Sequence, residues 1–228
     1  MNEPARTSEQ KKLLEKYVAA VMRAPGSLQL TAAKSEVEFW ERHILDALSL
    51  LELLPDEHYQ QNFKAIDIGS GNGIPGIPAA IALPQWQLFL LDSNNKKSGF
   101  LDMFCNSNRI GNIHILPGRA EALAHQLAFR AQFDIAFARA LSKLPTALEL
   151  SIPFLKVGGI LIIPHGNAYQ SALTKSENAL HELRTSLMKT QPYKVGNSLS
   201  FTALFFRKDQ ETPERYPRKE GVPKKRPL

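Results

Sequence analysis

Four glycines, at Gly69, Gly71, Gly73 and Gly76, follow a short run of apolar residues. Glycine adopts positive φ without strain, so a ligand can approach the backbone closely. The apolar run predicts a strand, and Pro75 suits the first turn of a helix that follows. A loop between a strand and a helix N-terminus presents backbone amides to electron-rich groups. The sequence therefore predicts a ligand-binding loop rather than a plain tight turn.

Two kinds of cofactor fit this loop. Gly71, Gly73 and Gly76 match the G-x-G-x-x-G fingerprint of dinucleotide-binding proteins. The segment from Asp67 to Gly73 also matches the acidic-x-Gly-x-Gly-x-Gly loop that resembles methyltransferases. Asp67 favours the second interpretation, because a carboxylate before the loop repels a pyrophosphate. It attracts the cationic amine end of S-adenosylmethionine, directly or through water.

A second carboxylate, Asp92, ends the next predicted strand. A carboxylate at this position accepts hydrogen bonds from ribose hydroxyls. Both cofactors contain a ribose, so Asp92 does not distinguish between them. The alternative is that Asp92 caps the helix that begins near Asn94.

Two arginines follow the third and fourth predicted strands. Arg119 precedes the pair Ala120 and Glu121, whose backbone and side chain are placed to receive an adenine edge, and Arg139 follows the fourth strand. Ligands of open parallel sheets bind outside the carboxyl ends of the strands, so we expect both arginines at this crevice. The alternative for each arginine is a surface ion pair.

Several motifs are absent from the sequence. No Asn-Pro-Pro-Tyr or Asp-Pro-Pro-Tyr follows the fourth predicted strand, which disfavours transfer to exocyclic amines, and no Pro-Cys supports a cysteine adduct. Cys105 lies within a predicted helix beside Phe104 and is interpreted as a core residue. His43 and Asp46 lie one helical turn apart and are interpreted as a structural pair.

These absences favour a nucleophile that needs no general base. Guanine N7 is such a nucleophile, because its exposed lone pair carries no proton and attack requires only alignment and desolvation. An arginine that held guanine O6 and N7 together would block the reacting atom. An arginine in this site should therefore hold O6 alone, a phosphate or the cofactor.

The pattern of apolar residues predicts the elements that position these groups. We expect helices over 8–24, 35–54, 75–83, 95–107, 119–129, 143–153 and 169–188, and strands over 65–68, 88–91, 113–116, 133–138, 160–163, 191–195 and 199–206. Strands that alternate with helices predict an α/β, Rossmann-like fold with a mostly parallel seven-stranded sheet. Only Gly196, Asn197 and Ser198 separate the closing strands, so the last strand should be antiparallel. The predicted parts are an N-terminal helical extension (1–60), a core (61–207) and a basic tail (208–228).

Composition fits a soluble globular protein, since 43% of the 228 residues are hydrophobic and 22% are charged. The many charges among the first twenty residues disfavour a secretory signal, and the apolar runs are too short to cross a bilayer. A lone cysteine forms neither an internal disulfide nor a structural zinc site. We therefore expect a cytoplasmic monomer without metal.

The net charge of +6 is concentrated at the C-terminal end of the chain. Residues 207–228 contain eight Lys or Arg against four Asp or Glu. A mobile basic segment suits a polyanion, because it displaces counterions from phosphates. The alternative is a solubilising tail.

Taken together, these strings resemble the bacterial 16S ribosomal RNA guanine-N7 methyltransferase family, also called glucose-inhibited division protein B. The resemblance covers nearly the whole chain, and the Leu-Asp-Ser string with its lysines, combined with the closing tail, makes it specific. The matching strings are Leu30-Thr31, Arg42–Asp46, Asp67–Pro78, Leu90–Ser93, Lys96-Lys97, Phe100-Leu101, Arg119–Glu121, Arg139-Ala140 and Arg215–Leu228.

The resemblance implies a Rossmann-like methyltransferase with S-adenosylmethionine as the methyl donor and N7 of one guanine in 16S rRNA as the acceptor. It implies 16S rRNA or the small ribosomal subunit as the partner, with the basic tail in the RNA surface. It also implies S-adenosylmethionine contacts at Gly69, Ile74, Ala120, Glu121 and Arg139, with Arg119 as a second functional arginine. Together with the loop, the expected cofactor site is Asp67, Gly69, Gly71, Gly73, Ile74, Asp92, Ala120, Glu121 and Arg139, and the expected catalytic residues are Arg119 and Arg139.

Two other functions are consistent with the residues. One is a nicotinamide-dependent oxidoreductase that uses Gly71, Gly73 and Gly76, against which Asp67 and the closing hairpin both argue. The other is an RNA-binding module that keeps a vestigial pocket, which the intact loop and Asp92 disfavour.

Overall fold

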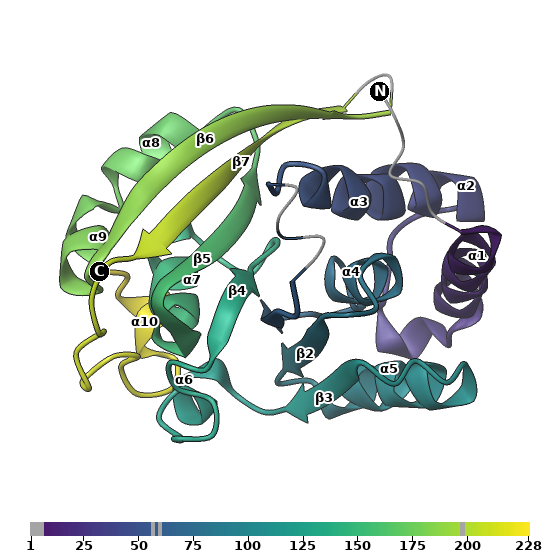
Figure 1. Ribbon diagram of the computed structural model, residues 1–228, viewed down its shortest axis with the longest axis horizontal. Coiled ribbons are helices and arrows are strands. Elements are labelled where there is room, and N and C mark those ends of the chain that lie inside the picture. Colours follow the sequence, from purple (N-terminus) through teal and green to yellow (C-terminus); the bar gives the residue numbers. More distant parts are fainter. Residues whose placement is uncertain (1–6, 56–57, 59–60, 197–198) are drawn as a thin grey trace.

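The computed structural model describes residues 7–55, 58, 61–196 and 199–228. The first six residues, and Asn197 and Ser198 between the closing strands, lie outside this part of the chain. A seven-stranded sheet forms the centre, in the order β3-β2-β1-β4-β5-β7-β6 (Figure 1). Its strands are β1 (Lys64–Ile68), β2 (Gln87–Asp92), β3 (Ile113–Pro117), β4 (Phe133–Phe137), β5 (Leu155–His165), β6 (Thr185–Val195) and β7 (Leu199–Lys208).

Strand direction agrees with the sequence-based expectation. β7 pairs antiparallel with both β5 and β6, whereas the pairs among β1, β2, β3, β4 and β5 are parallel. The prediction of a mostly parallel, seven-stranded sheet with an antiparallel last strand is therefore confirmed.

Helices cover both faces of the sheet (Figure 1). One face carries α1 (Ser8–Arg23), α2 (Glu36–Phe39), α3 (Leu45–Leu51), α4 (Gly76–Ala82) and α5 (Asn95–Ser107). The other carries α6 (Ala120–Leu123), α7 (Leu144–Ser151), α8 (Tyr169–Thr174) and α9 (Glu177–Glu182), while α10 (Val222–Lys225) packs on α7. Among the described helices, none is long and apolar enough to cross a bilayer.

The two layers follow from the alternation of side chains along the strands. In β1, Ala65 packs into the core beneath α1–α5, whereas Ile66 and Ile68 pack into the core beneath α6–α9. In β5, Ile162 and Leu161 divide between the two cores in the same way. Central strands that are apolar on both faces are typical of a parallel sheet covered by helices.

The predicted long helix over 169–188 is wrong. Two short helices, α8 and α9, replace its first part, and Arg184 then adopts a positive φ of 55°. Thr185 begins β6 and lies opposite Lys208 of β7. Helical periodicity over 169–188 is a local signal, and pairing with a strand that follows later in the chain overrides it.

Three other predicted elements have different bounds in the structure. The helix predicted over 119–129 is helical only in α6, because the Arg130 guanidinium donates to the carbonyl oxygens of Ala124, Thr212 and Tyr216 and holds a turn. The helix predicted over 35–54 is α2, a π-helical turn (Trp40–Ile44) and α3. β5 begins already at Leu155 rather than at Ile160, and a 3-10 turn (Ile152–Phe154) precedes it.

The sequence does not indicate whether the basic tail is ordered, and in the structure the tail is packed against the body. The Arg218 Nη2 lies 2.6 Å from Glu149 Oε2, and Nε donates to Oε1 at 2.8 Å. Glu149 is fully buried, and Tyr216 of the tail is buried in the core beneath α6–α9. The tail carries cations whose partners lie far away in the sequence, and these pairs fix it in place.

We predict that Arg218→Met lowers the free energy of unfolding by about 3 kcal/mol, because it removes the guanidinium and leaves the buried Glu149 carboxylate with only the backbone N–H of residue 218. Arg207→Met is the matched control, because Arg207 makes an exposed ion pair with Asp209 and should lose under about 1 kcal/mol. Urea unfolding of both variants measures the difference. Equal losses of unfolding free energy in the two variants would contradict a stabilising role for the Arg218–Glu149 pair.

Candidate functional site

A cavity of about 460 Å³ opens beside the carboxyl ends of β1, β2 and β4. The strand order reverses between β1 and β4, and ligands of open α/β sheets bind at such a switch point. The volume lies within the range of small-molecule sites, about 300–1,000 Å³. Its wall includes these expected site residues: Gly69, Gly71, Ile74, Asp92, Arg119, Ala120, Glu121 and Arg139.

The glycine loop (residues 69–74) forms one side of this cavity. Gly69 and Gly71 adopt φ of 70° and 55°, which favour glycine over any other residue. A Cβ at Gly69 would also overlap Leu141 Cδ1. The N–H groups of Gly69 and Ser70 donate to the Leu91 carbonyl at 2.8 and 3.0 Å, which ties the loop to the end of β2.

Two expected site residues, Asp67 and Gly73, do not line the cavity. A Cβ at Gly73 would contact Ile77 and Leu101, so this glycine faces the core. Asp67 is fully buried beneath the loop, where its Oδ2 accepts the Gly76 N–H at 3.0 Å. Both residues therefore shape the glycine loop from behind rather than forming its surface.

Burial dominates the electrostatics of Asp67. Desolvation raises the pKa of its carboxyl group to about 7, against the partial compensation of the Gly76 N–H and the Arg139 charge. Within the described part of the chain, Asp67 Oδ1 has no hydrogen-bond partner. Above that pKa the ionised Asp67 carboxylate, directly behind the glycine loop, is a local source of negative potential for a cationic ligand.

Asp92 is held in place by backbone donors. Its Oδ2 accepts the Gly71 N–H and its Oδ1 accepts the Asn94 N–H, both at 2.8 Å. The cap of α5 is Asn94, whose side chain accepts from Lys96 N and Lys97 N, so the alternative role of Asp92 as that cap is not the one observed. A carboxylate has about four acceptor positions, so Asp92 keeps capacity for hydroxyl groups in the cavity.

The N-terminal helices support the glycine loop, which the sequence did not indicate. The hydroxyl group of Tyr17, a fully buried residue of α1, donates to the Asn72 carbonyl oxygen. The Asn72 side chain donates to the Leu30 carbonyl at 2.9 Å, and both residues line the cavity. Sequence separation hides these contacts, although Leu30 belongs to one of the strings that carry the family resemblance.

Arg139 joins the sheet to the N-terminal helices. Its Nε lies 2.8 Å from Asp46 Oδ2, and its Nη2 lies 3.1 Å from His43 Nδ1 and 3.4 Å from the Arg42 carbonyl oxygen. Asp46 is buried and also accepts the Tyr193 hydroxyl at 2.7 Å. His43 and Asp46, interpreted from the sequence as a structural pair, are two partners of one arginine that borders the cavity.

Burial and the two neighbouring arginines keep His43 neutral. Desolvation first, and then the charges of Arg139 and Arg42, lower the pKa of His43 to about 4. Because Arg139 donates to Nδ1, the hydrogen-bond network assigns the ring proton to Nε2. Neutral His43 is therefore an acceptor for Arg139 and a donor at its other nitrogen.

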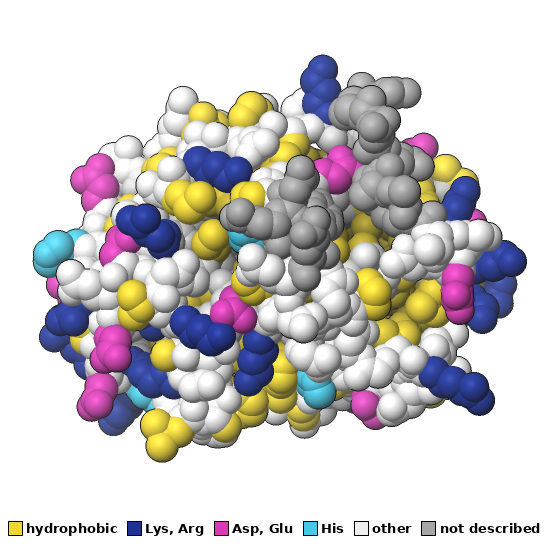
Figure 2. Space-filling model, in the orientation of Figure 1, with side chains coloured by type: hydrophobic (Ala, Val, Ile, Leu, Met, Phe, Trp, Pro, Cys, Tyr) yellow, Lys and Arg dark blue, Asp and Glu magenta, His cyan; other side chains and the backbone are white. Residues whose placement is uncertain are grey.

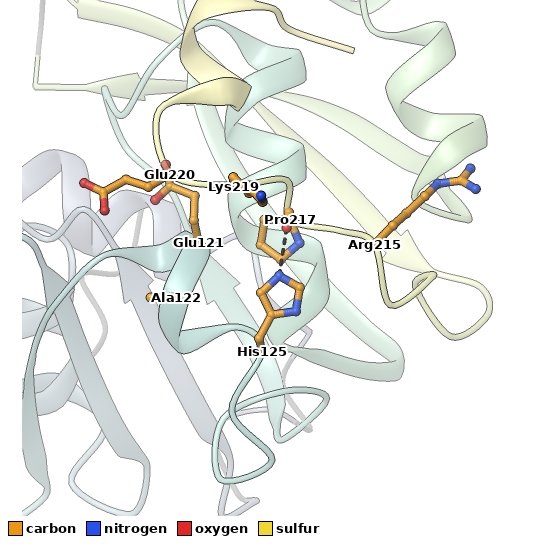
Figure 3. A pocket seen from close by; sticks show the side chains of 7 residues that line it. All are labelled: Glu121, Ala122, His125, Arg215, Pro217, Lys219 and Glu220. Carbon is orange, nitrogen blue, oxygen red and sulfur yellow. Dashed lines mark hydrogen bonds between the residues drawn. The ribbon is translucent and has the colours of Figure 1, made fainter.

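The C-terminal segment forms part of the cavity wall. Gly221 and Lys224 line the cavity, and Gly221 N donates to Glu121 Oε1 at 3.0 Å. Arg119 pairs with Glu220 at 3.0 Å, and both side chains are largely exposed. Figure 3 shows Glu121 of α6 reaching toward this segment, while the His125 Nε2 lies 2.8 Å from the Pro217 carbonyl oxygen. The tail thus contributes to the site itself.

Charges around this region are mixed in sign. Figure 2 shows basic side chains interspersed with acidic ones on the visible face. Among the residues that the structure describes, no three His, Cys, Asp or Glu side chains come together as a metal site. The chemistry available at the cavity is that of backbone amides, the carboxylates of Asp92 and Glu121, and the cations Lys97, Arg119, Arg139 and Lys224.

Several solved structures share this fold. The chain aligns with TrmN from Thermus thermophilus at a TM-score of 0.58 and 16% identity, over 85% of this chain and 52% of that one. It aligns with M. jannaschii TYW2 in complex with AdoMet at a TM-score of 0.52 and 13% identity, over 68% and 78% of the two chains. The fold is that of the Rossmann-like, S-adenosylmethionine-dependent methyltransferases.

Sequence relatives identify the family. The family described as "GidB: rRNA small subunit methyltransferase G" matches residues 10–197. A relative named "Ribosomal RNA small subunit methyltransferase G" from Streptococcus pyogenes serotype M1 is 35% identical over 97% of this chain and 93% of its own. One of the same name from Oenococcus oeni is 37% identical over 95% and 88%. The chain belongs to the rRNA small subunit methyltransferase G family.

We predict that Gly76→Ala destabilises the glycine loop, because a Cβ there would overlap the buried Leu90 Cδ2 and lie 3.0 Å from Asp67 Oδ2. Overpacking of this kind costs about 1–3 kcal/mol. Gly99→Ala in α5 is the control, because its Cβ would meet nothing within 4 Å, and alanine favours a helix by about 1 kcal/mol. Thermal unfolding should separate the two variants, and a stable Gly76→Ala variant would be inconsistent with this packing.

We predict that the effect of Asp67→Asn on stability depends on pH. The folded pKa of about 7 lies above the ordinary value of 3.8, so the folded protein binds more protons between these values. The free energy of unfolding should then fall as pH rises through this window. Asparagine has no proton to lose, so the variant should gain stability relative to the parent from pH 4 to pH 7. Urea unfolding at several pH values measures this, and a pH-independent difference argues against it.

Proposed function

We propose that this protein transfers the methyl group of S-adenosylmethionine to N7 of a guanine in 16S ribosomal RNA. The observation that carries the proposal is the similarity to relatives named ribosomal RNA small subunit methyltransferase G, which spans 97% of the chain. The cavity supports it, because the glycine loop, Asp92 and the start of α6 converge there. We further propose that the protein acts in the cytoplasm, as a monomer, on 16S rRNA or the small subunit.

The residues around the cavity fit S-adenosylmethionine. The backbone of Gly69 and Gly71 would take its amino-acid end, with Asp67 supplying negative potential from behind. Asp92 would accept from the ribose hydroxyls, and Ala120 and Glu121 would meet the adenine edge. Apolar residues in the same wall, Ile68, Ile74, Leu91, Leu141 and Leu150, would cover the remaining surface.

Bound S-adenosylmethionine supplies an electrophilic methyl group on a positively charged sulfur. Attack by guanine N7 requires no removal of a proton, so the residues of this chain need only bind, orient and exclude water. Arg139 is the arginine placed to orient the acceptor, because it borders the cavity and is fixed by Asp46 and His43. Arg119 is exposed and pairs with Glu220, so we propose that it acts at the mouth of the cavity, on RNA phosphates.

We predict that the purified protein methylates small-subunit RNA that lacks the modification, and that Arg139→Ala reduces kcat by at least about 100-fold. Exposed Arg207 provides a control variant, Arg207→Ala, with near-parental activity. Transfer of a labelled methyl group measures the rate, and chemical cleavage specific for N7-methylguanosine locates the product. Absence of transfer by a parent protein that binds S-adenosylmethionine would contradict the proposed function.

A further inference from the structure

A second, larger cavity lies directly beside the methyl-donor cavity. Its volume is about 750 Å³, and its lining includes Thr31, His43 and Phe201. The elements that form it are the coil before α2, the π-helical turn and the start of β7. Of the residues expected at the cofactor and catalytic site, Arg139 alone is in its lining.

The two cavities share part of their walls. Leu30, Asn72 and Arg139 line both of them. Asn72 and Leu30 are joined by the 2.9 Å hydrogen bond, and the Asn72 backbone is held by Tyr17. Because these three residues border both cavities, the two cavities are adjacent. Transfer between ligands in them requires the reacting atoms to come within about 3–3.5 Å of each other.

The remaining donors of Arg139 are restricted to one nitrogen. Nε and Nη2 are engaged by Asp46, His43 and the Arg42 carbonyl, and no described residue accepts from Nη1. An arginine fork uses two nitrogens to hold guanine O6 and N7 together. Arg139 lacks a second free nitrogen, so it can hold O6 and leave N7 exposed.

The second cavity also offers an aromatic face and a neutral donor. Phe201 is half-buried, and its ring lies 5.9 Å from that of Tyr193, which fixes its position. His43 keeps a proton on Nε2, and no described residue bonds to that nitrogen. Unstacked bases in RNA are recognised by stacking on aromatic rings and by hydrogen bonds to their edges.

We propose that this second cavity receives the guanine base after it leaves the RNA stack. The base stacks on Phe201, and its O6 accepts from Arg139 Nη1 or His43 Nε2, so that N7 faces the methyl-donor cavity. The bond that forms joins N7 to the methyl carbon, and the bond that breaks joins that carbon to sulfur. The positive charge moves from sulfur to the guanine ring, and no proton is transferred. This inference rests on the proposed function.

Direct binding of guanosine 5′-monophosphate tests the cavity without relying on turnover. Titration of the parent, saturated with S-adenosylhomocysteine, should show binding that uridine 5′-monophosphate does not match. Phe201→Leu keeps apolar volume and removes the stacking face, so it should weaken guanosine monophosphate about tenfold. The Kd for S-adenosylmethionine should stay within about twofold of the parent.

Leu187→Ala, on neighbouring β6 and partly exposed, is the matched control and should bind guanosine monophosphate as the parent does. The KM for RNA should rise in Phe201→Leu alone. Equal binding of the two nucleotides by the parent, or unchanged binding by Phe201→Leu, would overturn the inference. If the parent methylates RNA and Phe201→Leu behaves like the control, the assignment of the second cavity is contradicted and the proposed function is not. If the parent binds S-adenosylmethionine but methylates no RNA, the proposed function itself is contradicted.

Discussion

A carboxylate that water cannot reach sets the geometry of this site. Asp67 lies under the glycine loop and holds the Gly76 N–H, and burial raises its pKa to about 7. Keeping such a group buried is costly unless the ligand above it returns favourable electrostatic energy. A cationic ligand returns such energy, whereas an anionic pyrophosphate is repelled. On the proposed function, the preference of the loop for a cationic cofactor would originate behind it, in a residue that does not line the cavity.

Arg139 connects this site to the rest of the molecule. It follows β4, yet its partners His43 and Asp46 come from the helical region before the sheet. Tyr17 makes a comparable connection from α1 to the backbone of Asn72. The N-terminal helices thus fix the wall between the two cavities, and the tail closes the donor cavity from the other side through Gly221 and Glu121.

The sequence predicted best where the signal is local. The alternation of strands and helices, the glycine loop and the short link before the last strand indicated the sheet and the position of the cavity. The sequence-based prediction was wrong where residues far apart in the chain determine the local structure. Thr185, for example, pairs with Lys208 instead of continuing a helix. Similarly, the sequence showed the positive charge of the tail but not that Arg218 pairs with Glu149. Asp67 was predicted as a cofactor-binding residue, and its burial beneath the loop could be seen only in the fold.

Calorimetric titration of the purified protein with S-adenosylmethionine and, separately, with a nicotinamide dinucleotide tests the central claim most directly. A negative potential behind the glycine loop predicts saturable binding of S-adenosylmethionine and no binding of the dinucleotide. Binding of the dinucleotide together with failure to bind S-adenosylmethionine would contradict the account.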